Sequence, residues 1–107
     1  MAGLIQTFYN DGQLREIYFV NDDKKEGEYK IYHCNGNLWE ICSYLNNKKE
    51  GKYIEYYFNN KPHIICNYSD GKREGEYRLY YDNEQLEKIY YYINDKKDGK
   101  YISYGRV

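Results

Sequence analysis

The sequence predicts an all-β protein, an elongated single-layer antiparallel sheet of tandem β-hairpins with about nine strands. Three observations predict this fold class. Aromatic residues make up 20% of the chain, and 17 of them are tyrosines, which strands favour. Turn dipeptides such as Asp11-Gly12 separate the runs of aromatic and β-branched residues. Glycines recur every 24 residues, at Gly3, Gly27, Gly51, Gly75 and Gly99.

This interval divides the chain into four full repeats and a partial fifth, which are expected to form one domain over residues 1–107. The repeats are 3–26, 27–50, 51–74, 75–98 and the partial 99–107. We number positions within a repeat from its glycine, which is position one. Three further positions recur and are expected to be structural: Tyr29, Tyr53 and Tyr77 at position three, Tyr32, Tyr56 and Tyr80 at position six, and Ile17, Ile41, Ile65 and Ile89 at position fifteen.

Each repeat is expected to form one hairpin of two strands. In the second repeat the strands are residues 28–32 and 38–44, which are rich in aromatic and β-branched residues. The dipeptides at positions nine and ten predict two-residue type I′ turns between the strands. These dipeptides are Asp11-Gly12 and Asn35-Gly36 in the first two repeats, and the weaker turn formers Asn59-Asn60 and Asn83-Glu84 in the next two.

A charged turn ends each repeat and leads into the next strand. The repeat glycine that follows it is expected to supply a positive φ or a β-bulge, because glycine has no Cβ to oppose either. A phosphate-binding role is disfavoured, since no helix follows these glycines. The glycines concerned are Gly27, Gly51, Gly75 and Gly99.

The turn position also predicts the two faces of the sheet. A two-residue turn at positions nine and ten pairs position three with sixteen and position four with fifteen. One face then collects positions three, five, seven, twelve, sixteen and eighteen, rich in Tyr and Leu, and the other collects positions six and fifteen. Because no second layer is predicted, the aromatic residues are expected to be buried against neighbouring repeats and by twisting of the sheet.

The last strand, near residues 100–104, is expected to be an unpaired edge. Such an edge either is blunted by Arg106 and the tail or pairs with a second copy to form a homodimer, which we favour. The edge residues of that dimer are Tyr101, Ile102 and Tyr104.

Cysteine and histidine spacing predicts neither a disulfide nor a metal site. Cys42 and Cys66 occupy the same position of adjacent repeats, so about 9.6 Å should separate them, which is beyond the reach of a disulfide. His33 and His63 lack the spacing of zinc ligands. The sequence contains no nucleophile–base arrangement or phosphate-binding loop, so we predict no enzyme activity and no cofactor.

Charge argues against nucleic acid and membrane partners. The net charge is −1, with 31% charged residues, so there is no positive field to attract polyanions. Lysines and arginines recur in the charged turns, but neighbouring Asp and Glu residues cancel them, which disfavours an anionic lipid surface. No targeting segment or membrane span is predicted, so we expect an intracellular, cytoplasmic protein in a reducing compartment.

The remaining aromatic residues indicate a protein-binding surface. Positions three and six can be explained as core, because half-buried phenols pack well with the hydroxyl in water. Aromatic side chains outside those positions are candidates for partner contacts, because such anchors dominate the energetics of interfaces. The candidates are Tyr9, Trp39, Tyr57, Phe58, Tyr81, Tyr90 and Tyr91.

The repeat pattern resembles the MORN repeat, and more closely its variant in YwqK-type antitoxin modules. The pattern is Gly-x-Tyr-x-x-Tyr-Tyr-x-Asn-Gly-x-Leu-x-x-Ile-x-x-Tyr, followed by a Lys-Lys-Glu-Gly turn, and it covers residues 3–104. Two residues depart from it: Ile5 replaces a tyrosine, and Pro62 replaces a leucine, where a missing hydrogen bond or a bulge is expected.

The resemblance implies a non-catalytic binding or scaffold module with a protein partner. The alternatives it implies are an antitoxin-like inhibitor of a toxin enzyme and a phospholipid-surface adaptor. Richness in Asn, Lys, Tyr and Ile is similar to MORN-type proteins of AT-rich bacteria or of large DNA viruses of amoebae, which would place a viral protein in the host cytoplasm.

Overall fold

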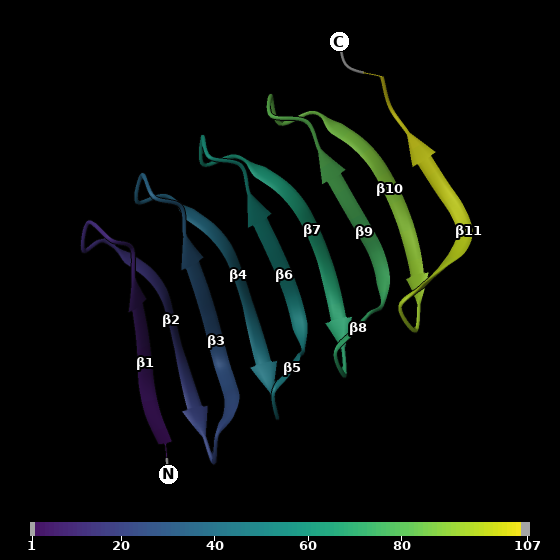
Figure 1. Ribbon diagram of the computed structural model, residues 1–107. Helices are drawn as coiled ribbons and strands as arrows, with labels where there is room; N and C mark the ends of the chain where they lie inside the picture. The colour runs from purple at the N-terminus through teal and green to yellow at the C-terminus, as the bar shows by residue number, and fades with distance from the viewer. Residues whose placement is uncertain (1, 106–107) are drawn as a thin grey trace.

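Strands form where the aromatic and β-branched residues of each repeat are concentrated. The computed structural model describes residues 2–105, apart from the side chain of Lys100, and over this range it shows one open antiparallel sheet and no helix (Figure 1). Its strands are β1 (Ala2–Phe8), β2 (Leu14–Asn21), β3 (Lys24–Tyr32), β4 (Leu38–Leu45), β5 (Lys48–Lys49), β6 (Gly51–Tyr56), β7 (Pro62–Ser69), β8 (Lys72–Arg73), β9 (Gly75–Tyr80), β10 (Leu86–Ile93) and β11 (Lys96–Ser103).

The strands follow one another across the sheet in chain order. Nine of those described lie on one path, β1-β2-β3-β4-β6-β7-β9-β10-β11, while the two-residue strands β5 and β8 pair with β4 and β7. The described part of the molecule measures 45 × 32 × 15 Å, which fits a single layer. The predicted fold class, a single-layer sheet of tandem hairpins with about nine strands, is therefore confirmed.

No described helix could cross a membrane.

The hairpin turns within the repeats differ from the prediction. At the first of them the Gly12 N–H donates to the Tyr9 carbonyl over 2.9 Å and the Tyr9 N–H donates to the Gln13 carbonyl over 2.8 Å, so the loop is residues 10–12. Only Gly12 in this loop has a positive φ, of 89°. The expected type I′ turn at Asp11-Gly12 is thus wrong: the loop has three residues, with glycine in the left-handed position.

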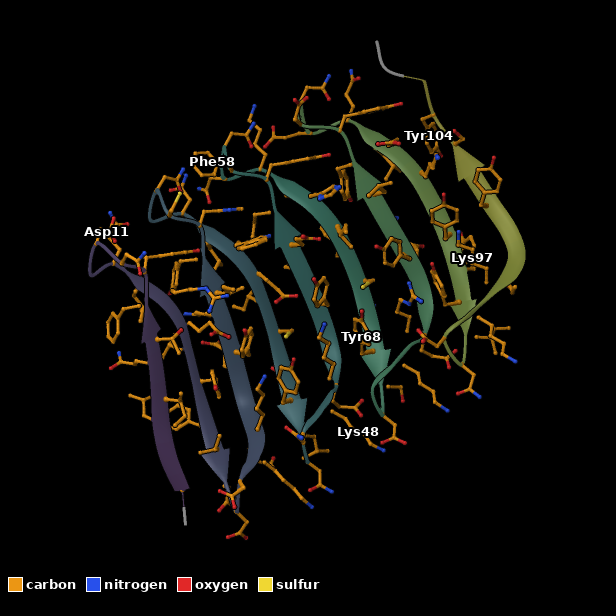
Figure 2. The ribbon with its side chains drawn as sticks, viewed as in Figure 1. Asp11, Lys48, Phe58, Tyr68, Lys97 and Tyr104 are labelled. Atoms are coloured by element: carbon orange, nitrogen blue, oxygen red, sulfur yellow. The ribbon has the colours of Figure 1, made fainter. Side chains whose placement is uncertain are left out.

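The two-residue loops lie at the opposite end of the sheet. Here two consecutive residues have positive φ, for example 55° at Asn46 and 69° at Asn47, as type I′ turns require. Figure 2 shows the two ends, with Asp11 and Phe58 at the three-residue loops and Lys48 beside a two-residue loop. Asn and Asp tolerate this conformation, which explains the composition of the charged turns.

The repeat glycines behave as predicted. Each lies in the left-handed region, with φ between 80° and 94° at Gly27, Gly51, Gly75 and Gly99. Register shifts at these points, such as the one opposite Tyr18 and Phe19, mark β-bulges. The bulge adds one residue after the tight two-residue loop, so that the strand resumes its pairing with the preceding strand.

The core lies on one face of the sheet and consists of tyrosine rings over two buried cysteines. Tyr29, Cys42, Tyr53 and Cys66 form this core, with exposed fractions of 2–9%. We call this side the core face. Tyr29 pairs with Cys42, as the predicted pairing of positions three and sixteen requires. The opposite side, which carries Ile17, Ile41, Ile65 and Ile89, is called the isoleucine face.

Position twelve lies on the isoleucine face, contrary to the expectation. Leu38 pairs with Tyr32 rather than with position seven, because the register shifts between Ile31 and Tyr32. Directly paired residues share a face, so the leucine packs on the side of position six. The same register shift occurs where Tyr56 pairs with Pro62. Because the first two repeats have this shift with leucine at position twelve, the proline occupies a bulge rather than causing one.

Glu84→Gly is expected to stabilise the protein by about 0.5–1 kcal/mol. Glu84 has a φ of 73° in the three-residue loop where the first two repeats have Gly12 and Gly36. Removing its Cβ relieves the left-handed strain. Urea unfolding measures the change, and Asn60→Gly, at the same position of the third repeat, should gain less because Asn tolerates this conformation. A less stable Glu84→Gly variant would contradict this account of the loop.

Candidate protein-binding surface

Position seven holds adjacent repeats together at the three-residue-loop end. There the Tyr57 hydroxyl donates to the Tyr80 carbonyl over 2.5 Å, and the Tyr81 hydroxyl donates to the Tyr104 carbonyl over 2.9 Å. The Tyr9 hydroxyl makes the same bond to Tyr32. Three of the predicted partner-binding residues, Tyr9, Tyr57 and Tyr81, therefore connect the first, third and fourth repeats to the repeat that follows.

His33 replaces tyrosine in this series. Its Nε2 lies 3.1 Å from the Tyr56 carbonyl, so the imidazole makes the same inter-repeat contact. The spacing of zinc ligands tests His33 only as a metal ligand. Its occurrence at position seven, where the other repeats have tyrosine, was the signal that it belongs to this series.

An aromatic cluster forms around His33. The imidazole stacks on Trp39 with a ring-centroid distance of 4.9 Å and meets Phe58 edge-on at 5.3 Å. Next to it, Tyr57 and His63 stack at 4.3 Å. We call these five residues the aromatic cluster. They come from three adjacent elements, the end of β3, β4 and the segment from β6 to β7, so only the folded sheet assembles them.

Glu55 connects the two halves of the aromatic cluster. The Trp39 Nε1–H donates to Glu55 Oε1 over 3.4 Å, and His63 Nδ1 lies 3.9 Å from Glu55 Oε2. The carboxylate thereby lies between the indole and the imidazole on the same side of the sheet. Trp39 and Phe58 remain 37% and 55% exposed, which leaves their rings available to a partner.

The other two predicted partner-binding residues lie elsewhere. Tyr90 is on the core face, stacked on Tyr101 at 5.5 Å, and Lys97 Nζ lies 4.0 Å from its ring centroid. Tyr91 borders a shallow hollow of about 620 Å³ near Asp98 and Ile102. Of the seven predicted residues, the structure brings Trp39, Tyr57 and Phe58 together and separates the rest.

Of the eight Lys and Arg side chains in the charged turns, four lie over tyrosine rings of the core face. Lys25 Nζ lies 4.9–5.0 Å from the ring centroids of Tyr18, Tyr29 and Tyr44. Lys49 and Arg73 take corresponding places over Tyr53 and Tyr92. These cation–π contacts hold position twenty-three over the core face and away from the outer rim of the turns.

The glutamates of the charged turns also contact the next repeat. Carboxylates of Glu26, Glu50 and Glu74 accept hydrogen bonds of 3.0–3.2 Å from backbone N–H groups of the following turn. The sequence predicts only that they neutralise the lysines and arginines beside them. Their regular contact with a turn 20 residues further along the chain was not visible from local charge alone.

Buried phenols and thiols are held in their neutral forms. Burial raises the pKa of Tyr44, Tyr68 and Tyr77 to about 12, and it raises the pKa of Tyr29 and Tyr53 further, together with hydrogen bonds to Glu16 and Glu40. Burial likewise raises the pKa of the Cys42 and Cys66 thiols to about 11 and 12, and both cysteines are free. Within residues 2–105 no three His, Cys, Asp or Glu side chains are placed to hold a metal ion.

The repeats match a known sequence family over most of the chain. The profile of the family described as "MORN repeat variant" matches residues 2–22, 25–46, 49–70 and 73–94. The chain belongs to the MORN repeat variant family. No curated protein is detectably similar to it over its sequence.

The family's general role can be compared with the contacts that recur in this chain and with those that do not. MORN repeats are non-enzymatic repeats that are generally associated with binding of proteins or membranes. In this MORN chain, the positions that recur account for the core and for the bonds between repeats. The aromatic cluster, by contrast, depends on residues that individual repeats do not share, namely His33, Trp39, Phe58 and His63.

Proposed function

We propose that this MORN repeat protein is a non-catalytic interaction module that binds a partner protein through the aromatic cluster. The observation that carries the proposal is the stack of His33 on Trp39, next to the half-exposed ring of Phe58. Clustered aromatic side chains supply large contact areas and dominate binding energy at protein interfaces.

The cluster is also ordered before a partner arrives. His33 lies 3.1 Å from the Tyr56 carbonyl and stacks on Trp39, whose Nε1–H also reaches Glu55, so the rings lose little side-chain freedom on binding. A preorganised surface pays less conformational entropy and so binds more tightly for the same contact area.

The turn cations give less support to a lipid-binding role. Lys25, Lys49 and Arg73 lie over tyrosine rings, and Lys48 Nζ lies 3.4 Å from Asp70. A polybasic surface would need these charges free at the rim of the sheet. The protein-binding role is therefore the one that the contacts favour.

The double variant Trp39→Ala and Phe58→Ala is expected to lose the partner. Tagged wild-type protein and the variant are used for pull-downs from lysate of the native cell, read by quantitative mass spectrometry. The affinity of the captured protein is then measured. Removing two anchors of this kind should weaken binding at least about 30-fold, since hot-spot residues contribute 2 kcal/mol or more.

A matched control distinguishes binding through the aromatic cluster from nonspecific hydrophobic binding. Leu45 and Ile93 are 58% and 61% exposed but lie at the two-residue-loop end, so Leu45→Ala and Ile93→Ala together should retain the partner. Tyr57 is left intact in both variants because its hydroxyl joins two repeats. A partner lost from the control variant but kept by the Trp39 and Phe58 variant would refute the proposal.

A further inference from the structure

The outer strand β1 is unusual among the strands that begin the repeats. Its sequence, residues 2–8, contains no charged residue, whereas β3, β6, β9 and β11 all carry Lys, Arg, Asp or Glu. Natural proteins usually place charges, proline or bulges on exposed sheet edges to prevent pairing with other chains. Among the described residues of β1, Ala2–Phe8, none of these devices is present.

The backbone of β1 is also oriented for pairing. The Tyr9 N–H donates to the Gln13 carbonyl, so Tyr9 points its backbone groups toward the neighbouring strand. Backbone direction alternates along a strand, and the nearby bulge lies on β2, so Leu4, Gln6 and Phe8 direct their N–H and C=O groups outward. These three residues form a regular open ladder.

The side chains of the same residues leave apolar surface exposed. Leu4 and Phe8 are 50% and 56% exposed on the isoleucine face, and Phe19, which pairs with Leu4, is 52% exposed. Exposed apolar side chains beside an open ladder are characteristic of a pairing site.

We propose that β1 pairs antiparallel with β1 of a second copy of this chain, about a two-fold axis that passes between the two Gln6 residues. In this register Leu4 lies opposite Phe8 of the second copy, and Phe8 lies opposite its Leu4. One symmetric contact therefore covers Leu4 and Phe8 of both copies, as an isologous interface requires. The pairing joins two sheets into one continuous sheet with the isoleucine faces on the same side.

A second copy fits this edge better than it fits β11. Charged side chains on an edge strand oppose pairing with another chain, and β1 has none, while β11 contains Lys96, Lys97 and Asp98. The Gln6 side chains, which meet at the axis, can hydrogen-bond to each other because an amide both donates and accepts. This inference does not depend on the aromatic cluster, which lies on β3 to β7.

The first test is the mass of the protein in solution. Light scattering and sedimentation from low to high micromolar concentration should show a monomer–dimer equilibrium, since one strand pair is a small interface. Leu4→Lys and Phe8→Lys should each weaken dimerisation at least about tenfold by introducing like charges at the contact. Ile102→Lys, on β11, should leave it unchanged.

Hydrogen exchange gives a second, independent test. Amide protons of Leu4, Gln6 and Phe8 should become protected as protein concentration rises, while those of Tyr101 and Ser103 on the other edge should not. Gln6→Pro should abolish the dimer with little loss of monomer stability, because its N–H points outward. A monomer at high micromolar concentration, or a dimer that only Ile102→Lys dissociates, would overturn the proposal; a dimer retained by the Trp39 and Phe58 variant would show that the two surfaces are separate.

Discussion

Tyr53→Ala is expected to lower the free energy of unfolding by about 3–5 kcal/mol, the range for removing a large aromatic side chain from a core. Tyr53 is 9% exposed, packs edge-on against Tyr68 at 5.5 Å and lies beneath the ammonium group of Lys49. A single layer has no second sheet that could move in to fill the cavity. Urea unfolding followed by circular dichroism measures the loss.

Two variants show whether burial is the cause. Tyr101 occupies the same position of the last repeat but is 59% exposed, so Tyr101→Ala should cost far less. Tyr53→Phe keeps the ring and removes only the hydroxyl, which should cost about 1 kcal/mol. Equal losses for Tyr53→Ala and Tyr101→Ala would show that the core is not where the structure places it.

Alkaline pH is expected to unfold the sheet cooperatively between about pH 10 and 12. Burial raises the pKa of Tyr44, Tyr68 and Tyr77 to about 12 from 10.0, and it raises the pKa of Tyr29 and Tyr53 as well. Above pH 10 the unfolded chain releases these protons while the folded chain retains them, so stability falls as pH rises. Below pH 10 the contribution is complete.

The size of this effect comes from the number of phenols. Each contributes at most about 1.4 kcal/mol per pH unit, so five together contribute at most roughly 14 kcal/mol over two units, which is comparable to the roughly 5–15 kcal/mol that stabilises a typical domain. Absorbance of tyrosinate and far-ultraviolet circular dichroism should therefore change together. Tyr77→Phe should shift the transition to higher pH. Tyrosines that ionise near pH 10 in an intact sheet would contradict the prediction.

Part of the candidate surface could be predicted from the sequence. Trp39, Tyr57 and Phe58 were identified because they lie outside the positions that explain the core, and the structure places them together. His33 and His63 were missed, since stacking depends on which strands become neighbours. Tyr9 and Tyr81 make the same inter-repeat bond as Tyr57 but lie outside the cluster. Their repeats have Arg15 and Glu87 at the position of Trp39 and His63, so no ring is available there for stacking.

The sequence by itself determined the fold. A gapless repeat of 24 residues with alternating apolar positions forms a hairpin, and each hairpin must pack against the neighbouring repeats to bury its tyrosines. It also determined the glycine bulges, which depend only on backbone freedom. The tertiary structure decided the turn types and the face of position twelve. A bulge shifts the register by one residue, and in a strand with a period of two that shift moves a side chain to the opposite face.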